Sequence, residues 1–167
     1  MIEHQKLRKS FKPSEIKVLF VAEAPPVNDN FFYSEKSLVR TYTEKAFRTY
    51  YGSEISKYLN FKDFFKSEGF YLDDLCHVPT SFKDICKNKN QYIQELSIRL
   101  KDYNPKAIII TPLRVDGFVR EAIWMSGLAI EPGLIFTLSF PGNGWQNEYI
   151  RGLEQALAIM ISKGTIK

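Results

Sequence analysis

Cysteine and histidine are scarce in this sequence, and their scarcity excludes several kinds of site. The 167 residues include two cysteines, Cys76 and Cys86, and two histidines, His4 and His77. A structural zinc site uses four such ligands, so these residues cannot form one without help from carboxylates. We therefore expect two free thiols, no metal site and no cofactor.

Long apolar runs are also lacking. No stretch approaches the roughly 18 uninterrupted apolar residues of a membrane span. The N-terminal residues MIEHQKLRKSFK lack the apolar centre of a secretory signal. We therefore expect a cytoplasmic protein with no membrane partner. A hydrophobic content of 44% supplies enough apolar mass for one domain over residues 1–167, with a basic N-terminal extension at about residues 1–14.

Three motifs of common α/β proteins are missing. The sequence contains no Gly-x-Ser-x-Gly elbow, no Gly-Lys-Ser/Thr phosphate loop, and no Gly-x-Gly-x-x-Gly after an apolar run. These absences disfavour an unrelated α/β hydrolase or nucleotide-binding protein. The net charge of +4 permits a polyanionic partner without requiring one.

Apolar runs do occur at regular intervals, and they predict four strands at residues 18–22, 70–75, 107–111 and 134–139. Residues at helical spacing fill the stretches between them. One predicted helix ends at Asn104-Pro105, and another begins with Thr111 as its N-cap and ends at Gly127. Residues 38–66 predict one or two further helices, and residues 149–164 predict a last one.

This alternation predicts a three-layer α/β/α fold with a four-stranded, mainly parallel sheet. Ligands of such sheets bind in the crevice beyond the carboxyl ends of the strands. The residues that directly follow each strand are therefore the candidate site: 23–30, 74–79, 111–114 and 140–146.

The first of these loops carries an acid that stability alone does not explain. In KVLFVAEAPP, Glu23 follows a buried run directly, and Pro25-Pro26 stiffens the loop that carries it. Glu23 is therefore a candidate catalytic group. The alternative is that Glu23 caps or salt-bridges the end of a neighbouring helix.

Two other strand-end loops carry groups that suit a nucleotide. Asn30-Phe-Phe-Tyr33 offers flat aromatic faces, and the stretch SFPGNGWQ offers backbone amides just before a helix, where anions bind well. Trp145 has a large apolar side chain, and such side chains can insert between stacked bases of DNA. The alternative is that the aromatic residues belong to the core and that Gly-Asn-Gly is only a turn.

The stretch Ala22-Glu-Ala-Pro-Pro26 resembles the first motif of the uracil-DNA glycosylase superfamily. In that family an acid in the first motif follows strand one, an aromatic residue stacks on the base, an asparagine ends strand two, and a second motif follows strand four. Matched by order, these positions fall on Glu23, on Phe32 or Tyr33, on Asp74, and on residues 140–142.

The resemblance implies a monomeric DNA-repair hydrolase that breaks the N-glycosidic bond of a damaged or deaminated, uracil-like base. It implies Glu23 as the catalytic carboxylate, which positions water or stabilises the cationic sugar. The other implied contacts are to base or phosphate from Ala22, Phe32, Tyr33, Asp74, His77, Pro141, Gly142 and Asn143, and to DNA from Arg114, Trp145 and Gln146.

The sequence departs from the family pattern at three points. Asp74 stands where asparagine is expected, and a carboxylate cannot donate to a uracil carbonyl as an amide does. Phe140 stands where the second motif usually has a histidine, although His77 is a candidate substitute donor. Two cysteines cannot hold the iron–sulfur cluster of the branch with the most similar first motif. A catalytically weak or inactive nucleic-acid-binding or nucleobase-binding member of the superfamily is therefore the alternative.

Overall fold

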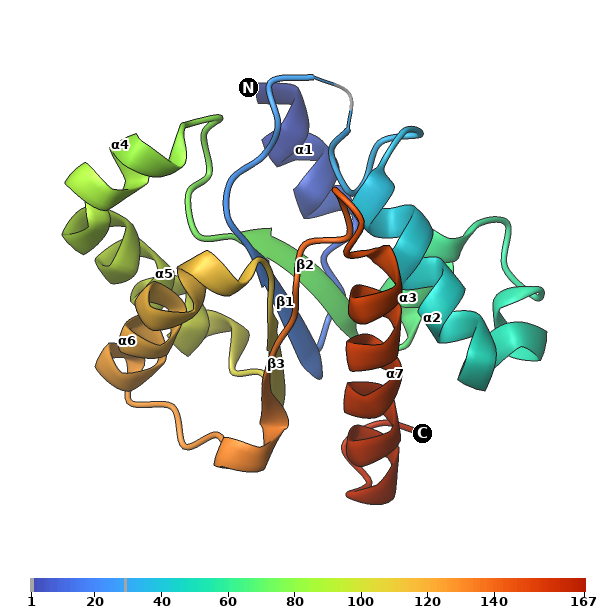
Figure 1. The fold of residues 1–167 in the computed structure, drawn as a ribbon. Coiled ribbons are helices and arrows are strands. Elements are labelled where there is room, and N and C mark those ends of the chain that lie inside the picture. The colour runs from blue at the N-terminus through green and yellow to red at the C-terminus, as the bar shows by residue number, and fades with distance from the viewer. Residues whose placement is uncertain (1, 29) are drawn as a thin grey trace.

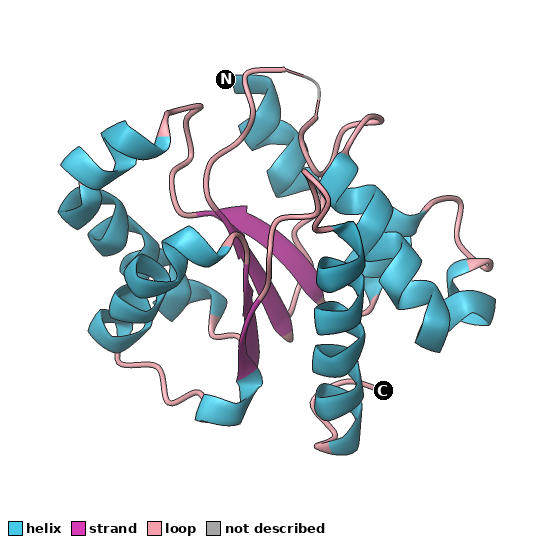
Figure 2. Cartoon of the chain, in the orientation of Figure 1, coloured by secondary structure: helices cyan, strands magenta, loops and turns pink. Residues whose placement is uncertain are grey.

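A four-stranded sheet forms the centre of the protein in the computed structural model, which describes residues 2–28 and 30–167. Its strands lie in the order β2-β1-β3-β4, and all three pairings are parallel. Their bounds are β1 Val18–Ala22, β2 Phe70–Asp74, β3 Ala107–Ile110 and β4 Ile135–Thr137. Figures 1 and 2 show the sheet between two layers of helices, which confirms the predicted α/β/α class.

The helices divide between the two faces of the sheet. Figure 1 shows α2, α3 and α7 on one side and α4, α5 and α6 on the other, with α1 near the β2 edge. Their bounds are α1 Ile2–Ser10, α2 Leu38–Ile55, α3 Phe61–Ser67, α4 Phe82–Lys87, α5 Lys89–Tyr103, α6 Asp116–Ser126 and α7 Gln146–Ser162. None of these helices has the length and apolar content that crossing a membrane requires.

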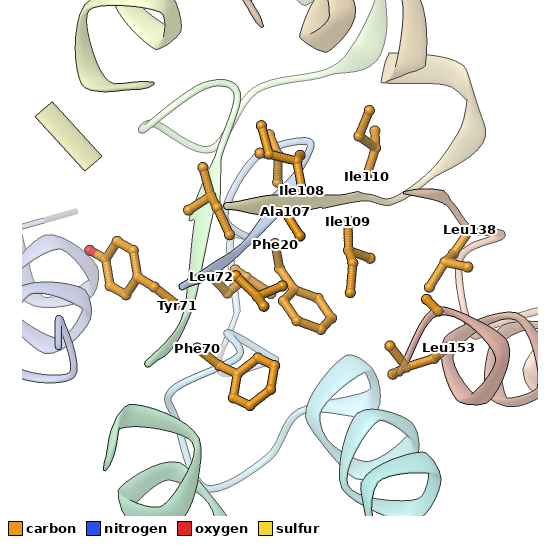
Figure 3. Packing of buried hydrophobic residues seen from close by; sticks show 14 of the residues in the cluster. Phe20, Phe70, Tyr71, Leu72, Ala107, Ile108, Ile109, Ile110, Leu138 and Leu153 are labelled. Carbon is orange, nitrogen blue, oxygen red and sulfur yellow. The ribbon is translucent and has the colours of Figure 1, made fainter. Parts of the chain in front are cut away.

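Both faces of the central strands are buried, which explains why these strands are continuous apolar runs. The side chains of β1 from Val18 to Val21 have no exposed area. In Figure 3, Phe20 and Ile109 point toward the layer that contains Leu153 of α7, whereas Ile108 and Ile110 point the other way. Aromatic rings fill the space under α2 and α3, where Phe47 lies 4.8 Å from Phe70 between ring centroids.

Short polar residues and a glycine set several helix ends, two of which the sequence predicts. The side chains of Ser37 and Asn60 accept hydrogen bonds from backbone amides in the first turns of α2 and α3. At the other ends, Asn104 and Gly127 adopt left-handed backbone conformations, with φ of 44° and 73°. The predicted stops of α5 and α6 are therefore confirmed.

Three expectations differ from the structure. Thr111 does not cap α6, because a 3₁₀ turn at Leu113–Val115 comes first and Thr111 Oγ1 donates to Ser139 O over 3.3 Å. The last strand is shorter than residues 134–139, since Leu134 belongs to the 3₁₀ turn Pro132–Leu134. The basic N-terminal extension contains a helix, α1, and its Arg8 is buried in the fold.

Candidate functional site

One cavity collects residues from the loops beyond all four strands. It measures about 870 Å³, which lies within the range of small-molecule sites. Its wall includes Glu23 after β1, Asp74 at the end of β2, Arg114 after β3 and Asn143 after β4. These residues come from distant parts of the sequence, and parallel strands bring them together because their carboxyl ends share one edge.

The cavity separates the predicted site residues into two groups. Those that line it are Ala22, Glu23, Phe32, Asp74, Arg114, Gly142, Asn143 and Trp145. The others lie elsewhere: Tyr33 and Pro141 are buried, His77 bonds to Asp73, and Gln146 begins α7. The structure therefore brings eight of the twelve predicted site residues to one cavity and places the other four outside it.

Glu23 and Arg114, which both line the cavity, form a bidentate salt bridge. Arg114 Nε and Nη2 donate to the two carboxylate oxygens over 2.5 and 2.7 Å. The hydrogen bond with Glu23 raises the pKa of the Arg114 guanidinium, which also lies 4.6 Å above the ring of Phe82. The salt bridge to a neighbouring helix end, which was the alternative to a catalytic role for Glu23, is therefore present, and Glu23 also lines the cavity.

Of the two aromatic candidates, only Phe32 lies at the cavity. Tyr33 packs in the core, where its hydroxyl donates to Leu72 O over 3.0 Å and accepts from Leu72 N over 2.7 Å. Burial raises the pKa of this hydroxyl well above its ordinary value. The expectation that Tyr33 stacks on a ligand is therefore wrong, because its ring and its hydroxyl are both engaged in packing.

The turn after β4 lines the cavity, and one of its backbone amides is available to bind a ligand. Gly142 N donates to Phe140 O over 2.8 Å, and Trp145 N donates to Gly142 O over 3.0 Å, so both amides serve the turn itself. Within the described residues, Asn143 N has no hydrogen-bond partner. Asn143 and Gly144 have positive φ angles of 52° and 90°, which shape the turn. Of the two amides expected to hold a ligand, only that of Asn143 can do so.

Asp74 brings a second carboxylate into the cavity, although only 2% of its surface is exposed. One of its oxygens, Oδ2, accepts a short hydrogen bond from Arg8 Nη2. Burial raises the pKa of the Asp74 carboxyl to about 6, against the opposing effect of the Arg8 charge. Asp74 is therefore ionised at neutral pH but close to the point at which it takes up a proton.

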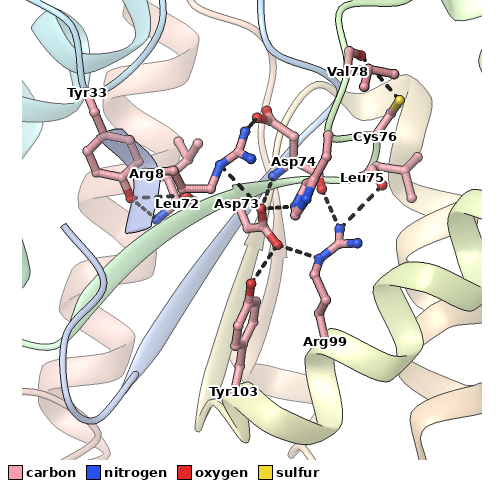
Figure 4. A network of polar contacts seen from close by, with 11 residues as sticks. Arg8, Tyr33, Leu72, Asp73, Asp74, Leu75, Cys76, Val78, Arg99 and Tyr103 are labelled. Carbon is pink, nitrogen blue, oxygen red and sulfur yellow. Dashed lines mark hydrogen bonds and ion pairs between the residues drawn. The ribbon is translucent and has the colours of Figure 1, made fainter. Parts of the chain in front are cut away.

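Asp73, the preceding residue, is fully enclosed by donors (Figure 4). Its two oxygens accept hydrogen bonds from one backbone amide and three side chains: Asp74 N at 2.9 Å, His77 Nε2 at 2.6 Å, Arg99 Nε at 2.8 Å and Tyr103 Oη at 3.1 Å. Burial alone would raise the pKa of Asp73, but the hydrogen bond from His77 and the Arg99 charge hold it well below its usual range. His77 is thus engaged with Asp73, which opposes its proposed role as a donor to a ligand.

Sequence reasoning did not find Arg8, Asp73 or Arg99. Arg99 carried a usable signal, because it lies between Leu96 and Leu100 on the apolar side of α5. A cation on such a face requires a buried acid, and the Asp73-Asp74 pair at the end of an apolar run supplies one. Arg8 carried no comparable signal, since the sequence of α1 contains only two apolar residues, Ile2 and Leu7, and is otherwise polar.

The described residues contain no group of three or more His, Cys, Asp or Glu side chains placed to hold a metal ion. No protein-family model matches the sequence, and no curated protein matches it either. The function of the cavity must therefore be inferred from its own geometry.

Proposed function

We propose that this protein hydrolyses the N-glycosidic bond of a damaged or deaminated base in DNA. The observation that carries the proposal is that Glu23, Phe32 and Asn143 line one cavity of suitable size for a flat heterocycle. The likeness of residues 22–26 to a glycosylase first motif supports the same conclusion. On this proposal the protein acts on DNA in the cytoplasm as a monomer.

The chemistry assigns a separate role to each group. As the glycosidic bond breaks, positive charge develops on the sugar and negative charge on the departing base. The Glu23 carboxylate stabilises the cationic sugar and orients the water that adds to the anomeric carbon. The fork of Arg114 fixes the carboxylate in a single orientation, because both guanidinium bonds must be kept.

The departing base needs a flat contact and hydrogen-bond donors. Phe32 offers a ring at the cavity wall, and the ring is itself held by Phe65 at 5.2 Å between centroids. The free backbone amide and the side chain of Asn143 supply donors from the loop after β4, which lines the same cavity. Trp145, which is 56% exposed, lies at the rim where neighbouring bases of the strand would pass.

A second function, binding without catalysis, has one observation in its favour. Both oxygens of Glu23 already accept hydrogen bonds from Arg114, which leaves fewer lone pairs for a water molecule. Phe140 adds nothing to the leaving group, since its side chain has no donor. A nucleic-acid-binding protein would need the cavity and its rim but not a catalytic acid.

The test is an excision assay on single-stranded and duplex oligonucleotides that carry uracil, hypoxanthine, xanthine, an ethenoadduct or an alkylated base. We expect one of these bases to be released by the wild-type protein and the rate to fall about 10²–10³-fold in Glu23→Gln. The matched control is Glu121→Gln, which makes the same change at an exposed site on α6. Binding without release of any base would favour the second function, and absence of DNA binding would contradict both.

A further inference from the structure

One carboxylate that lines the cavity is held by a hydrogen bond to only one of its two oxygens. Asp74 lies in register with Ala22 at the carboxyl end of the sheet and lines the cavity. Its Oδ2 atom is taken by Arg8, whereas its Oδ1 atom accepts no hydrogen bond from any residue that the structure describes. This second oxygen is a hydrogen-bond acceptor that remains available in the cavity.

The buried position of Arg8 makes this arrangement specific. Arg8 is only 2% exposed, its guanidinium lies 5.3 Å from the centroid of Phe31, and its Nε is 3.5 Å from Asp73 Oδ1. A charge buried this deeply is retained only where it is paired. The pairing holds the Asp74 carboxylate in place and keeps it ionised at neutral pH despite its burial.

An ionised carboxylate accepts hydrogen bonds and cannot donate them. A base that presented a carbonyl oxygen to Asp74 would bring two acceptors together at a side chain that is only 2% exposed, which carries a desolvation cost without a hydrogen bond. An exocyclic amine presents two N–H donors instead, and acidic side chains accept from the amine of cytosine in this way.

We propose that Asp74, positioned by Arg8, makes the cavity select a base with an exocyclic amine on the edge that faces Asp74, in preference to a uracil-like base. This inference rests on the proposed function and narrows its substrates to altered forms of the amino-bearing bases. Arg8 is a positioning residue in this scheme, because it acts through Asp74 and is not a lining residue of the cavity.

The selectivity depends on pH. The charged groups that act on Asp74 are Arg8 from α1, Asp73 from β2 and His77 from the loop after β2. With its pKa at about 6, the Asp74 carboxyl is ionised at pH 7.5 and becomes protonated as the pH falls below 6. A protonated carboxyl has an O–H donor and can serve a carbonyl. The preference for the amine therefore weakens in acid.

The experiment measures binding, so that it does not require catalysis. The probes are oligonucleotides with one 2′-fluoroarabino nucleoside, which resists hydrolysis, bearing either 5-methylcytosine or thymine. These two bases differ in whether C4 carries an amine or a carbonyl, with the matching change at N3. At pH 7.5 we expect the wild-type protein to bind the 5-methylcytosine probe about tenfold more tightly.

Three comparisons separate a selective role from a structural one. Asp74→Asn turns the acceptor into a group that can also donate, so we expect the preference to disappear or reverse while the fold persists. Arg8→Gln removes the positive charge, so we expect the preference to be lost at a higher pH than in the wild type, and Arg8→Lys should restore part of it. Asp102→Asn, at an exposed site on α5, should leave the ratio unchanged.

Each outcome has a distinct meaning. Equal or tighter binding of the thymine probe at pH 7.5, or an unchanged ratio in Asp74→Asn, would overturn this inference and leave the proposed glycosylase intact. Failure to bind either probe, together with no excision in the assay above, would overturn the proposed function and this inference with it.

Discussion

Two neighbouring aspartates at the end of β2 occupy very different surroundings. Asp73 faces α5. Each of its carboxylate oxygens accepts two hydrogen bonds, so neither oxygen remains available to a ligand. Asp74 points to the other side, keeps one oxygen open and lines the cavity. The alternation of a strand thus places a purely structural carboxylate next to an available one, and residue type alone does not distinguish them.

The largest effect should come from removing the saturated carboxylate. In Asp73→Ala, Arg99 loses its buried partner and Tyr103 loses its acceptor, which should lower the free energy of unfolding by about 3–5 kcal/mol. Urea denaturation followed by circular dichroism measures this change. Asp102→Ala is the control, because its ion pair with Lys12 is exposed and should be worth less than about 1 kcal/mol. Equal losses in both variants would mean that the donors around Asp73 do not stabilise the fold.

The Asp74 carboxyl should make the stability of the protein depend on pH. Its pKa is about 6 in the folded protein against an ordinary 3.8, so folding favours the protonated form. The resulting stability is fully present below about pH 3.8 and is lost as the pH rises through about 6, by about 3 kcal/mol in total at 1.36 kcal/mol per pKa unit.

This loss is measured by denaturation of the wild type and of Asp74→Asn between pH 4 and 7. The Asn variant cannot titrate at this position, so the difference between the two curves isolates Asp74 from Asp73. We expect the wild type to lose stability relative to the variant as the pH rises. A constant difference, or one of the opposite sign, would show that the Asp74 carboxyl is not destabilised by burial.

The smallest effect on stability should follow the loss of Arg114. Its side chain is 56% exposed, and ion pairs with exposed partners contribute about 0–1 kcal/mol. Arg114→Ala should therefore change the unfolding midpoint little but reduce excision, since Glu23 loses the fork that orients it. Thermal unfolding and the excision assay, carried out on the same preparation, distinguish these effects. A large loss of stability would assign Arg114 to the fold instead of the site.

Much of the fold could be predicted because central parallel strands are buried on both faces. Residues 18–22 show this clearly, since a continuous apolar run has few other uses in a chain of this composition. The start of β4 was less predictable, because a 3₁₀ turn at Pro132–Leu134 takes up Leu134. The burial of Arg8 in α1 was not predictable, because it depends on an ion pair with Asp74, which lies 66 positions away in the sequence.

The site was predictable in its location but not in its detail. The sequence pattern shows which residues directly follow a strand, so Glu23 and Asn143 could be identified as candidates. Whether a side chain points into a cavity depends on packing against other elements. Tyr33 shows the limit, since nothing in the sequence indicates that Leu72 holds its hydroxyl.

The hydrogen bonds of Tyr33 also affect how copies of this protein could associate through the edge of the sheet. Because β2 is an outer strand, its free amide and carbonyl groups form a template on which a foreign strand could extend the sheet. The phenol of Tyr33 occupies both groups of Leu72, midway along that strand. Asp73 Oδ1 and Arg99 Nη2 occupy the amide and the carbonyl of Asp74 in the same way, so side chains take up two positions of this edge and leave fewer groups for a foreign strand.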